Sequence, residues 1–104
     1  MAIGLQINKE TVGDSLIVHI TGDLNVKTSP ILEDELAKSI SGVKELIFDF
    51  ANVEYISSAG LRVLLAMEKT MRRQSGKMTL RNVNAAVEEI IRLAGFLQVM
   101  HIED

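Results

Sequence analysis

Cysteine is absent from the 104-residue sequence, which excludes disulfide bonds, cysteine-ligated zinc and thiol chemistry. Long apolar stretches are also absent, since no uncharged run approaches the ~20 residues that a membrane span requires. The first ten residues, MAIGLQINKE, lack the charged leader and long apolar core of a signal peptide. We therefore expect a cytoplasmic protein that does not span a membrane.

No strong excess of one charge is present either. The formal net charge is -3, with acidic and basic residues mixed along the chain, whereas a general nucleic-acid binder would show a clustered basic surface. The one basic cluster, Lys69, Arg72 and Arg73, falls late in an expected helix, where cations suit the helix dipole. The composition is 47% hydrophobic and 24% charged, and it predicts one globular domain over residues 1–104.

The beginning of the chain predicts a pair of strands. Residues 5–22 consist of two apolar segments joined by Gly13–Asp14, which supplies turn chemistry. In the second segment Leu16, Val18 and Ile20 alternate with other residues, as in a strand with one buried face.

A helix is expected next. Ser29 is a candidate N-cap, and Pro30 suits the first helical position. Leu32, Leu36 and Ile40 recur every four residues, so one stripe of this helix should face a core.

The middle of the chain predicts a central strand and a second helix. Near-continuous hydrophobicity in residues 43–50 is typical of a strand covered on both faces. The helical pattern of residues 61–74 should end at Gly76, a natural C-terminal cap. Residues 77–83 then predict another strand.

The last elements complete an alternating pattern. Asn84 should cap a helix over residues 85–95, which Gly95 ends, and residues 96–102 can form a final strand. The order is β-β-α-β-α-β-α-β. Strands that alternate with helices predict an α/β fold with a mixed β-sheet and helices packed on it.

Few catalytic chemistries fit these residues. The two histidines, His19 and His101, lie on separate predicted strands without partners at metal-ligand spacing. Residues 56–60 lack the first glycine of a hydrolase nucleophile elbow. Gly76–Lys77 does not fit a phosphate-binding Walker loop, because its other required positions hold methionines. We therefore expect no enzymatic activity, no metal and no cofactor.

Two serines and a glycine interrupt the apolar pattern between residues 56 and 61. Ser57 or Ser58 can cap the following helix, and Gly60 allows its first turn to pack closely. One cap needs one hydroxyl, so the second hydroxyl could accept a phosphate. The N-terminus of a helix stabilises added negative charge.

The segment LIFDFANVEYISSAGLRVLL, with TGDLN before it and IIRLAGF after it, resembles the STAS domain of bacterial anti-sigma factor antagonists. The similarity spans nearly the whole chain, and its most specific part is the Ser-Ser-Ala-Gly-Leu junction. The resemblance implies a protein-interaction switch. In that family the unphosphorylated domain binds an anti-sigma factor that is also a GHKL-type serine kinase, and this binding releases the sigma factor. The kinase then phosphorylates a junction serine, and a PPM-type phosphatase resets the switch.

The resemblance also implies which residues act. The family's phosphorylated position, two residues before the glycine, corresponds to Ser58. The binding face implied by the family consists of Gly22, Asp23, Leu24, Asn25, Ser57, Ser58, Ala59 and Gly60.

Two departures from the family pattern stand out. Ser57 occupies a position that is often Asp in the family, and the C-terminal helix common in family members does not follow the last predicted strand. The alternative is a STAS subunit that acts as an adaptor in a lipid-transport ATPase or a stress-signalling scaffold. In such a subunit, Ser58 would be a cap or contact residue.

Overall fold

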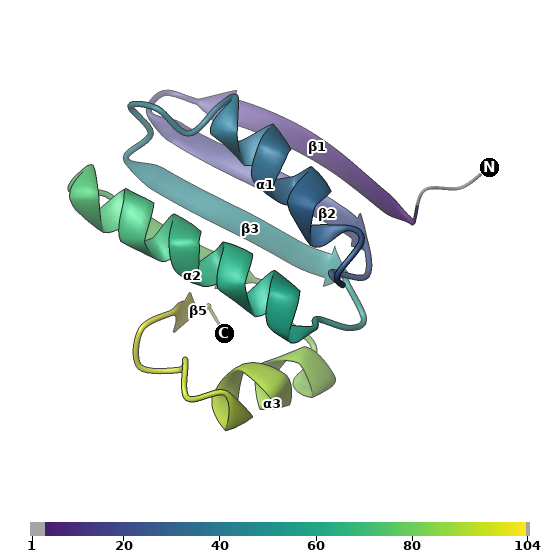
Figure 1. The fold of residues 1–104 in the computed structure, drawn as a ribbon. Helices are drawn as coiled ribbons and strands as arrows, with labels where there is room; N and C mark the ends of the chain where they lie inside the picture. The colour runs from purple at the N-terminus through teal and green to yellow at the C-terminus, as the bar shows by residue number, and fades with distance from the viewer. Residues whose placement is uncertain (1–3, 104) are drawn as a thin grey trace.

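Five strands and three helices follow one another along residues 4–103, the part of the chain that the computed structural model describes (Figure 1). In order, they are β1 (Leu5–Val12), β2 (Ser15–Gly22), α1 (Ser29–Ala37), β3 (Glu45–Asn52), α2 (Ser58–Arg73), β4 (Lys77–Arg81), α3 (Ala85–Leu93) and β5 (His101–Ile102). The predicted order and the mixed α/β class are confirmed. Within residues 4–103, no helix is long and apolar enough to cross a bilayer.

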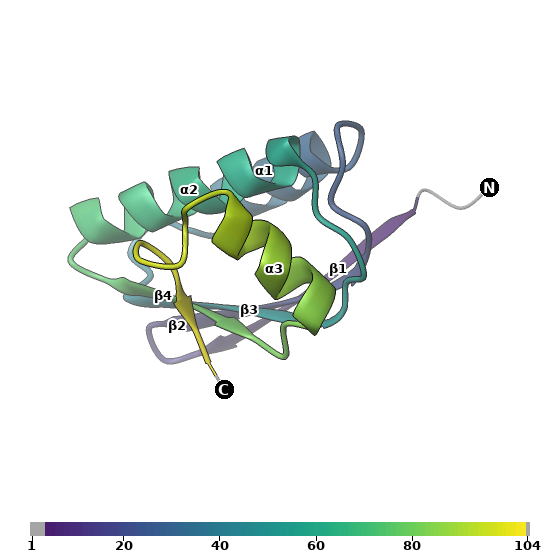
Figure 2. The same ribbon diagram turned by 90° about the horizontal axis from the view of Figure 1, so that it is seen from below.

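The sheet has the strand order β1-β2-β3-β4-β5, with β1 antiparallel to β2 and the other neighbours parallel. Each parallel connection moves one strand further in the same direction. Because such crossovers are right-handed, they place their helices on the same face of the sheet. The helices accordingly form one layer over the sheet, and no helix of residues 4–103 lies on the opposite face (Figure 2).

The core lies between these two layers. Leu16, Val18 and Ile20 of β2 are buried there, as their alternation predicts. Leu32 and Leu36 of α1 are also buried, which confirms two residues of the predicted stripe, whereas Ile40 lies after the end of the helix and is partly buried. Thus the core-facing pattern could be read directly from the sequence.

The prediction that β3 is covered on both faces is wrong. Leu46 and Phe48 point into the core, whereas Ile47 pairs in register with Ile17 and Thr79 on the face without helices. Ile47 is nevertheless only 8% exposed, since strands flank it on both sides. A central position in the sheet therefore accounts for the apolar run without a second helical layer.

Two predicted caps are also wrong. The N-cap of α1 is Thr28, and Ser29 is the first helical residue, which moves Pro30 to the second helical position. After α2 the left-handed residue is Ser75 rather than Gly76. Gly76 is instead constrained by space, because a Cβ there would lie 2.7 Å from the backbone oxygen of Lys44.

The C-terminal elements agree in part. Asn84 caps α3 by accepting a hydrogen bond from the Val87 N–H at 2.8 Å, and Gly95 follows with a positive φ. The strand predicted over residues 96–102 is only two residues long, because Phe96 O accepts backbone hydrogen bonds from Val99 and Met100 in a turn. Phe96, Val99 and Met100 of this segment pack at the core instead of extending the sheet.

Candidate functional site

The two segments implied as a binding face lie side by side at the carboxyl ends of β2 and β3. Leu24 and Ile56 form an isolated parallel bridge. The Leu24 N–H donates to Tyr55 O at 3.1 Å, and the Ser57 N–H donates to Leu24 O at 2.8 Å. The carboxyl end of a parallel sheet is the usual position for binding sites in α/β proteins.

Gly60 sits where α2 approaches this bridge. A Cβ at position 60 would lie 2.7 Å from Ile56 Cγ1 and 2.9 Å from Leu24 Cβ. Contacts this short are not tolerated without movement of the neighbours. The glycine therefore allows the close packing that its position in the sequence suggests.

The two serines have different roles in the structure. Ser57 is the N-cap of α2, in extended conformation, and its Oγ accepts a long hydrogen bond of 3.5 Å from the Gly60 N–H. Ser58 is the first helical residue and is exposed. This arrangement settles which serine caps the helix and leaves the Ser58 hydroxyl facing solvent.

The loop after β2 is held by its own hydrogen bonds. The Asn25 side-chain oxygen accepts from the Thr28 N–H at 3.0 Å, while Thr28 Oγ1 accepts from the Asn25 N–H at 2.8 Å and donates to Asp23 O at 2.7 Å. Such reciprocal side-chain to backbone bonds fix a turn in one conformation. Asn25 thus shapes the loop, and its side-chain oxygen is already engaged.

Gly22 fixes the start of this loop. Its φ is +120°, and a Cβ would lie 1.9 Å from the backbone oxygen of Gly4. Only glycine fits at such a crossing.

Burial divides the eight implied residues into three groups. Leu24 and Gly60 are buried, so they pack beneath the surface and are not accessible to a partner. Asp23 and Ser58 are exposed, and the remaining four are partly exposed: Gly22, Asn25, Ser57 and Ala59. The accessible part of the site is therefore smaller than the implied set.

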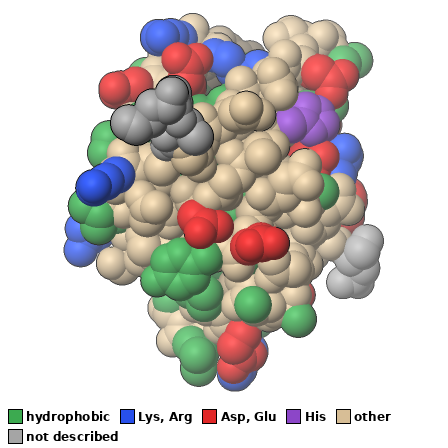
Figure 3. Space-filling view, turned by 90° about the vertical axis from the view of Figure 1, so that its right-hand side faces the viewer, with side chains coloured by type: hydrophobic (Ala, Val, Ile, Leu, Met, Phe, Trp, Pro, Cys, Tyr) green, Lys and Arg blue, Asp and Glu red, His purple; other side chains and the backbone are tan. Residues whose placement is uncertain are grey.

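Two exposed apolar side chains extend this surface and were missed from the sequence. Val26 is 73% exposed and Tyr55 is 49% exposed, and each is next in the chain to a residue of the joined loops. Figure 3 shows this end of the molecule, where carboxylates lie beside hydrophobic side chains and basic groups lie toward the margin. Val26 lies between the polar residues Asn25 and Lys27, and this was the available signal in the first loop; Tyr55 precedes the apolar Ile56 and gave no such signal.

A shallow groove opens beside Ser58, between the first turns of α1 and α2. Its volume is about 280 Å³, and it is lined by Val26, Ser29, Pro30, Glu33, Ala59, Arg62 and Val63. Ser29 is 2% exposed, and its Oγ has no hydrogen-bond partner. The groove therefore combines apolar walls with the charged side chains of Glu33 and Arg62.

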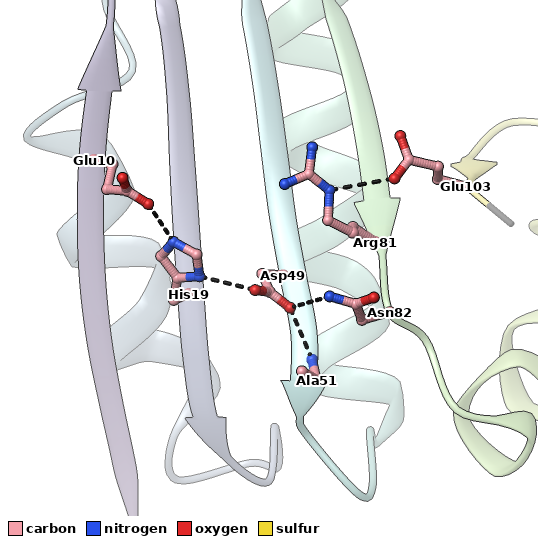
Figure 4. A network of polar contacts seen from close by, with 7 residues as sticks. All are labelled: Glu10, His19, Asp49, Ala51, Arg81, Asn82 and Glu103. Carbon is pink, nitrogen blue, oxygen red and sulfur yellow. Dashed lines mark hydrogen bonds and ion pairs between the residues drawn. The ribbon is translucent and has the colours of Figure 1, made fainter.

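A second polar cluster, also missed from the sequence, lies on the face of the sheet without helices (Figure 4). His19 Nε2 is 2.6 Å from Glu10 Oε1, and His19 Nδ1 is 2.9 Å from Asp49 Oδ2. Hydrogen bonds to Glu10 and then to Asp49 raise the pKa of His19 above its ordinary value. Because both ring nitrogens face carboxylates, the geometry fits the doubly protonated imidazolium.

Asp49 is the centre of this cluster. Burial acts to raise its pKa, but hydrogen bonds from Asn82, the Ala51 N–H and His19 outweigh burial and hold the pKa below its ordinary value. Asn82 donates at 3.0 Å from a left-handed backbone conformation that asparagine tolerates. Among residues 4–103, no three His, Asp or Glu side chains are placed to share a metal ion.

Comparison with known proteins identifies relatives over almost the full chain. The family described as "STAS domain" matches residues 6–104. BtrV of Bordetella bronchiseptica, assigned by name as an anti-sigma factor antagonist, is 30% identical over 99 residues, which cover 94% of this chain and 85% of BtrV.

Solved structures agree with the fold. SpoIIAA, an anti-sigma factor antagonist, in its unphosphorylated form has a TM-score of 0.81 at 17% identity, covering 95% of this chain and 89% of that one. The Bacillus SpoIIAA structure in the phosphorylated form has a TM-score of 0.73 at 16% identity, covering 95% and 92%. At these identities the structures establish a shared fold.

Proposed function

The chain belongs to the STAS domain family, and from this premise we propose that it is an anti-sigma factor antagonist controlled by phosphorylation of Ser58. In the unphosphorylated form it binds an anti-sigma factor that is also a GHKL-type serine kinase, and this binding releases the sigma factor. A PPM-type serine phosphatase restores the active form. The protein acts as one domain of residues 1–104 in the cytoplasm, without enzymatic activity, cofactor, membrane contact or direct nucleic-acid binding.

One observation carries this proposal: Ser57 caps α2, and the adjacent Ser58 hydroxyl is exposed at the joined loops. Modification of Ser58 can therefore change the surface without removing a cap. A relative with the same fold, SpoIIAA, has been solved in both phosphorylated and unphosphorylated forms, and BtrV supports the class of function.

The switch itself is electrostatic and steric. Phosphorylation joins Ser58 Oγ to the γ-phosphorus of ATP, with ADP as the leaving group and the hydroxyl proton released. The product adds about -1.5 to -2 charges at pH 7. The first turn of α2 tolerates this charge, because its free N–H groups and dipole favour anions.

The same charge weakens binding of the partner kinase. A bulky dianion would crowd the surface formed by the loop of Asp23 and the first turn of α2, and it would lie near the carboxylate of Asp23. If lost and repulsive contacts together cost about 3 kcal/mol, the affinity for the kinase falls by roughly two decades. This loss is enough to release the kinase for renewed binding of the sigma factor.

Incubation with cognate kinase and ATP tests the assignment, with mass spectrometry of the peptide that contains both serines. Ser58→Ala should bind the kinase and acquire no phosphate, and Ser58→Asp should bind about a hundredfold more weakly. Ser57→Ala is the matched control, since it removes the neighbouring hydroxyl and should still be phosphorylated. Phosphate transfer to Ser58→Ala would contradict the proposal. Absence of phosphate on the unaltered protein, together with stable co-purification with a transporter, would favour the adaptor function.

A further inference from the structure

Arg62 lies one helical turn after Ser58 in α2. Residues four apart share one face of a helix, with Cβ atoms about 5–6 Å apart. Long side chains on a helix also lean toward its N-terminus, so Arg62 leans toward Ser58. The Arg62 side chain is exposed, and within residues 4–103 it forms no ion pair. Its guanidinium is therefore available for an anion at position 58.

The groove beside Ser58 supports the same conclusion. Arg62 and Ala59 contribute to its α2 wall, and Ser29 contributes from α1. The Ser29 hydroxyl oxygen is buried below the groove surface, so among the lining residues Arg62 supplies the positive charge. A phosphate on Ser58 would be attached at the residue directly before Ala59, at the edge of this groove.

Charge also favours Arg62 as the partner of the phosphate. Exposed Asp23 and Glu54 belong to the two strand-end loops, and Glu33 lies across the groove. A dianionic phosphate attracts a guanidinium more strongly than the single carboxylate of Glu33 can, and guanidinium matches phosphate oxygens in a bidentate geometry. Arg62 would thereby offset repulsion between the phosphate and the neighbouring carboxylates.

We propose that Arg62 binds the phosphate carried by Ser58 and thereby prolongs the phosphorylated, inactive state. This inference rests on the proposed function, because it assumes that Ser58 is the modified residue. A phosphatase must take the phosphate away from Arg62 before hydrolysis, which slows the reset. Arg62 is thus a positioning residue for the modified side chain. Within residues 4–103 it forms no ion pair that would stabilise the fold.

The test uses protein with phosphoserine installed at position 58 during translation, so that no kinase is needed. A phosphorus NMR titration measures the second phosphate pKa, which is about 6 for an unperturbed phosphoserine. Pairing with Arg62 should lower this pKa, and Arg62→Gln should raise it back by roughly 0.5 to 1 unit. Arg62→Lys retains the charge and should give an intermediate value.

Lys69→Gln is the matched control, because it removes one positive charge from the same face of the same helix. Position 69 is eleven residues from Ser58, about 16 Å along the axis, which exceeds the screening length at physiological salt. This control should leave the phosphate pKa unchanged. Lys27→Gln provides a second comparison, since Lys27 is an exposed cation in the neighbouring loop.

The reset rate provides an independent measurement. A manganese-loaded PPM-type phosphatase should hydrolyse the Arg62→Gln phosphoprotein roughly two- to fivefold faster than the parent. An unchanged pKa in Arg62→Gln, or a larger shift in Lys27→Gln or Lys69→Gln, would overturn the role of Arg62. Failure of the kinase to modify Ser58 would instead overturn the proposed function, because the installed phosphoserine still reports on Arg62.

Discussion

Thr28 and Ser29 are adjacent hydroxyl residues at the start of α1, and both are buried. Thr28 Oγ1 forms hydrogen bonds with both Asp23 and Asn25, whereas Ser29 Oγ has none. A buried hydroxyl without a partner costs free energy, while a paired one is expensive to remove. Neighbouring residues of similar chemistry therefore have opposite effects on stability.

We predict that Ser29→Ala raises the free energy of unfolding by about 1 kcal/mol, because it removes an unpaired buried polar group. The nearly isosteric Thr28→Val should lower the free energy of unfolding by about 1–3 kcal/mol, since it leaves buried loop groups unpaired. Urea denaturation of both variants measures the difference. A loss of stability in Ser29→Ala would show that its hydroxyl has a partner.

On the face of the sheet without helices, hydrogen bonds between side chains connect neighbouring strands. His19 of β2 connects Glu10 of β1 to Asp49 of β3, and Asn82 after β4 binds the same carboxylate (Figure 4). His19 and Asp49 are direct cross-strand neighbours. Such pairs stabilise a sheet, and this pair depends on protonation.

The pKa directions set the pH dependence. The pKa of His19 is raised on folding, so its contribution is complete below the unfolded value of about 6.5 and is lost as pH rises through the folded pKa. The pKa of Asp49 is lowered, so its contribution is present above the unfolded value of about 3.9 and is lost as pH falls through the folded pKa. We expect this cluster to stabilise the protein most between these two unfolded values.

His19→Gln should flatten the decline in unfolding free energy as pH rises from about 6.5, the unfolded pKa, through the raised folded pKa. Urea denaturation across that range measures the slope. His101→Gln is the control, since His101 is exposed on the short β5 strand and has no carboxylate partner among the described residues. An equal slope in the parent and His19→Gln proteins would show that the cluster does not couple protonation to folding.

At the scale of the whole molecule, local patterns were predictable and contacts between distant segments were not. The alternation of Leu16, Val18 and Ile20 and the Asn84 cap follow from neighbours in the sequence, and both are present. The junction of Leu24 with Ile56 and the pairing of His19 with Asp49 depend on strand register, which one sequence does not specify. Similarity to a family, rather than periodicity, pointed to the two loops of the site.

The error about β3 has a related cause. An apolar run records how little of a strand is exposed, but it does not record whether helices or flanking strands exclude the water. Ile47 is shielded largely by neighbouring strands on the face without helices, whereas Val18 is fully buried beneath the helical layer. A hydroxyl introduced at position 18 should therefore change the free energy of unfolding by a different amount from a hydroxyl introduced at position 47.

A pair of threonine substitutions tests this one-sided architecture. Val18→Thr preserves side-chain volume and places a hydroxyl in the helix-covered core, so it should lower the free energy of unfolding by about 1–3 kcal/mol. Ile47→Thr removes more apolar volume, yet its hydroxyl can reach water at the face without helices, so its cost should be smaller than that of Val18→Thr. Urea denaturation of the two variants under the same conditions gives the comparison. A larger loss from Ile47→Thr would contradict the prediction, because the apolar volume removed at position 47 would then outweigh the access of its hydroxyl to water.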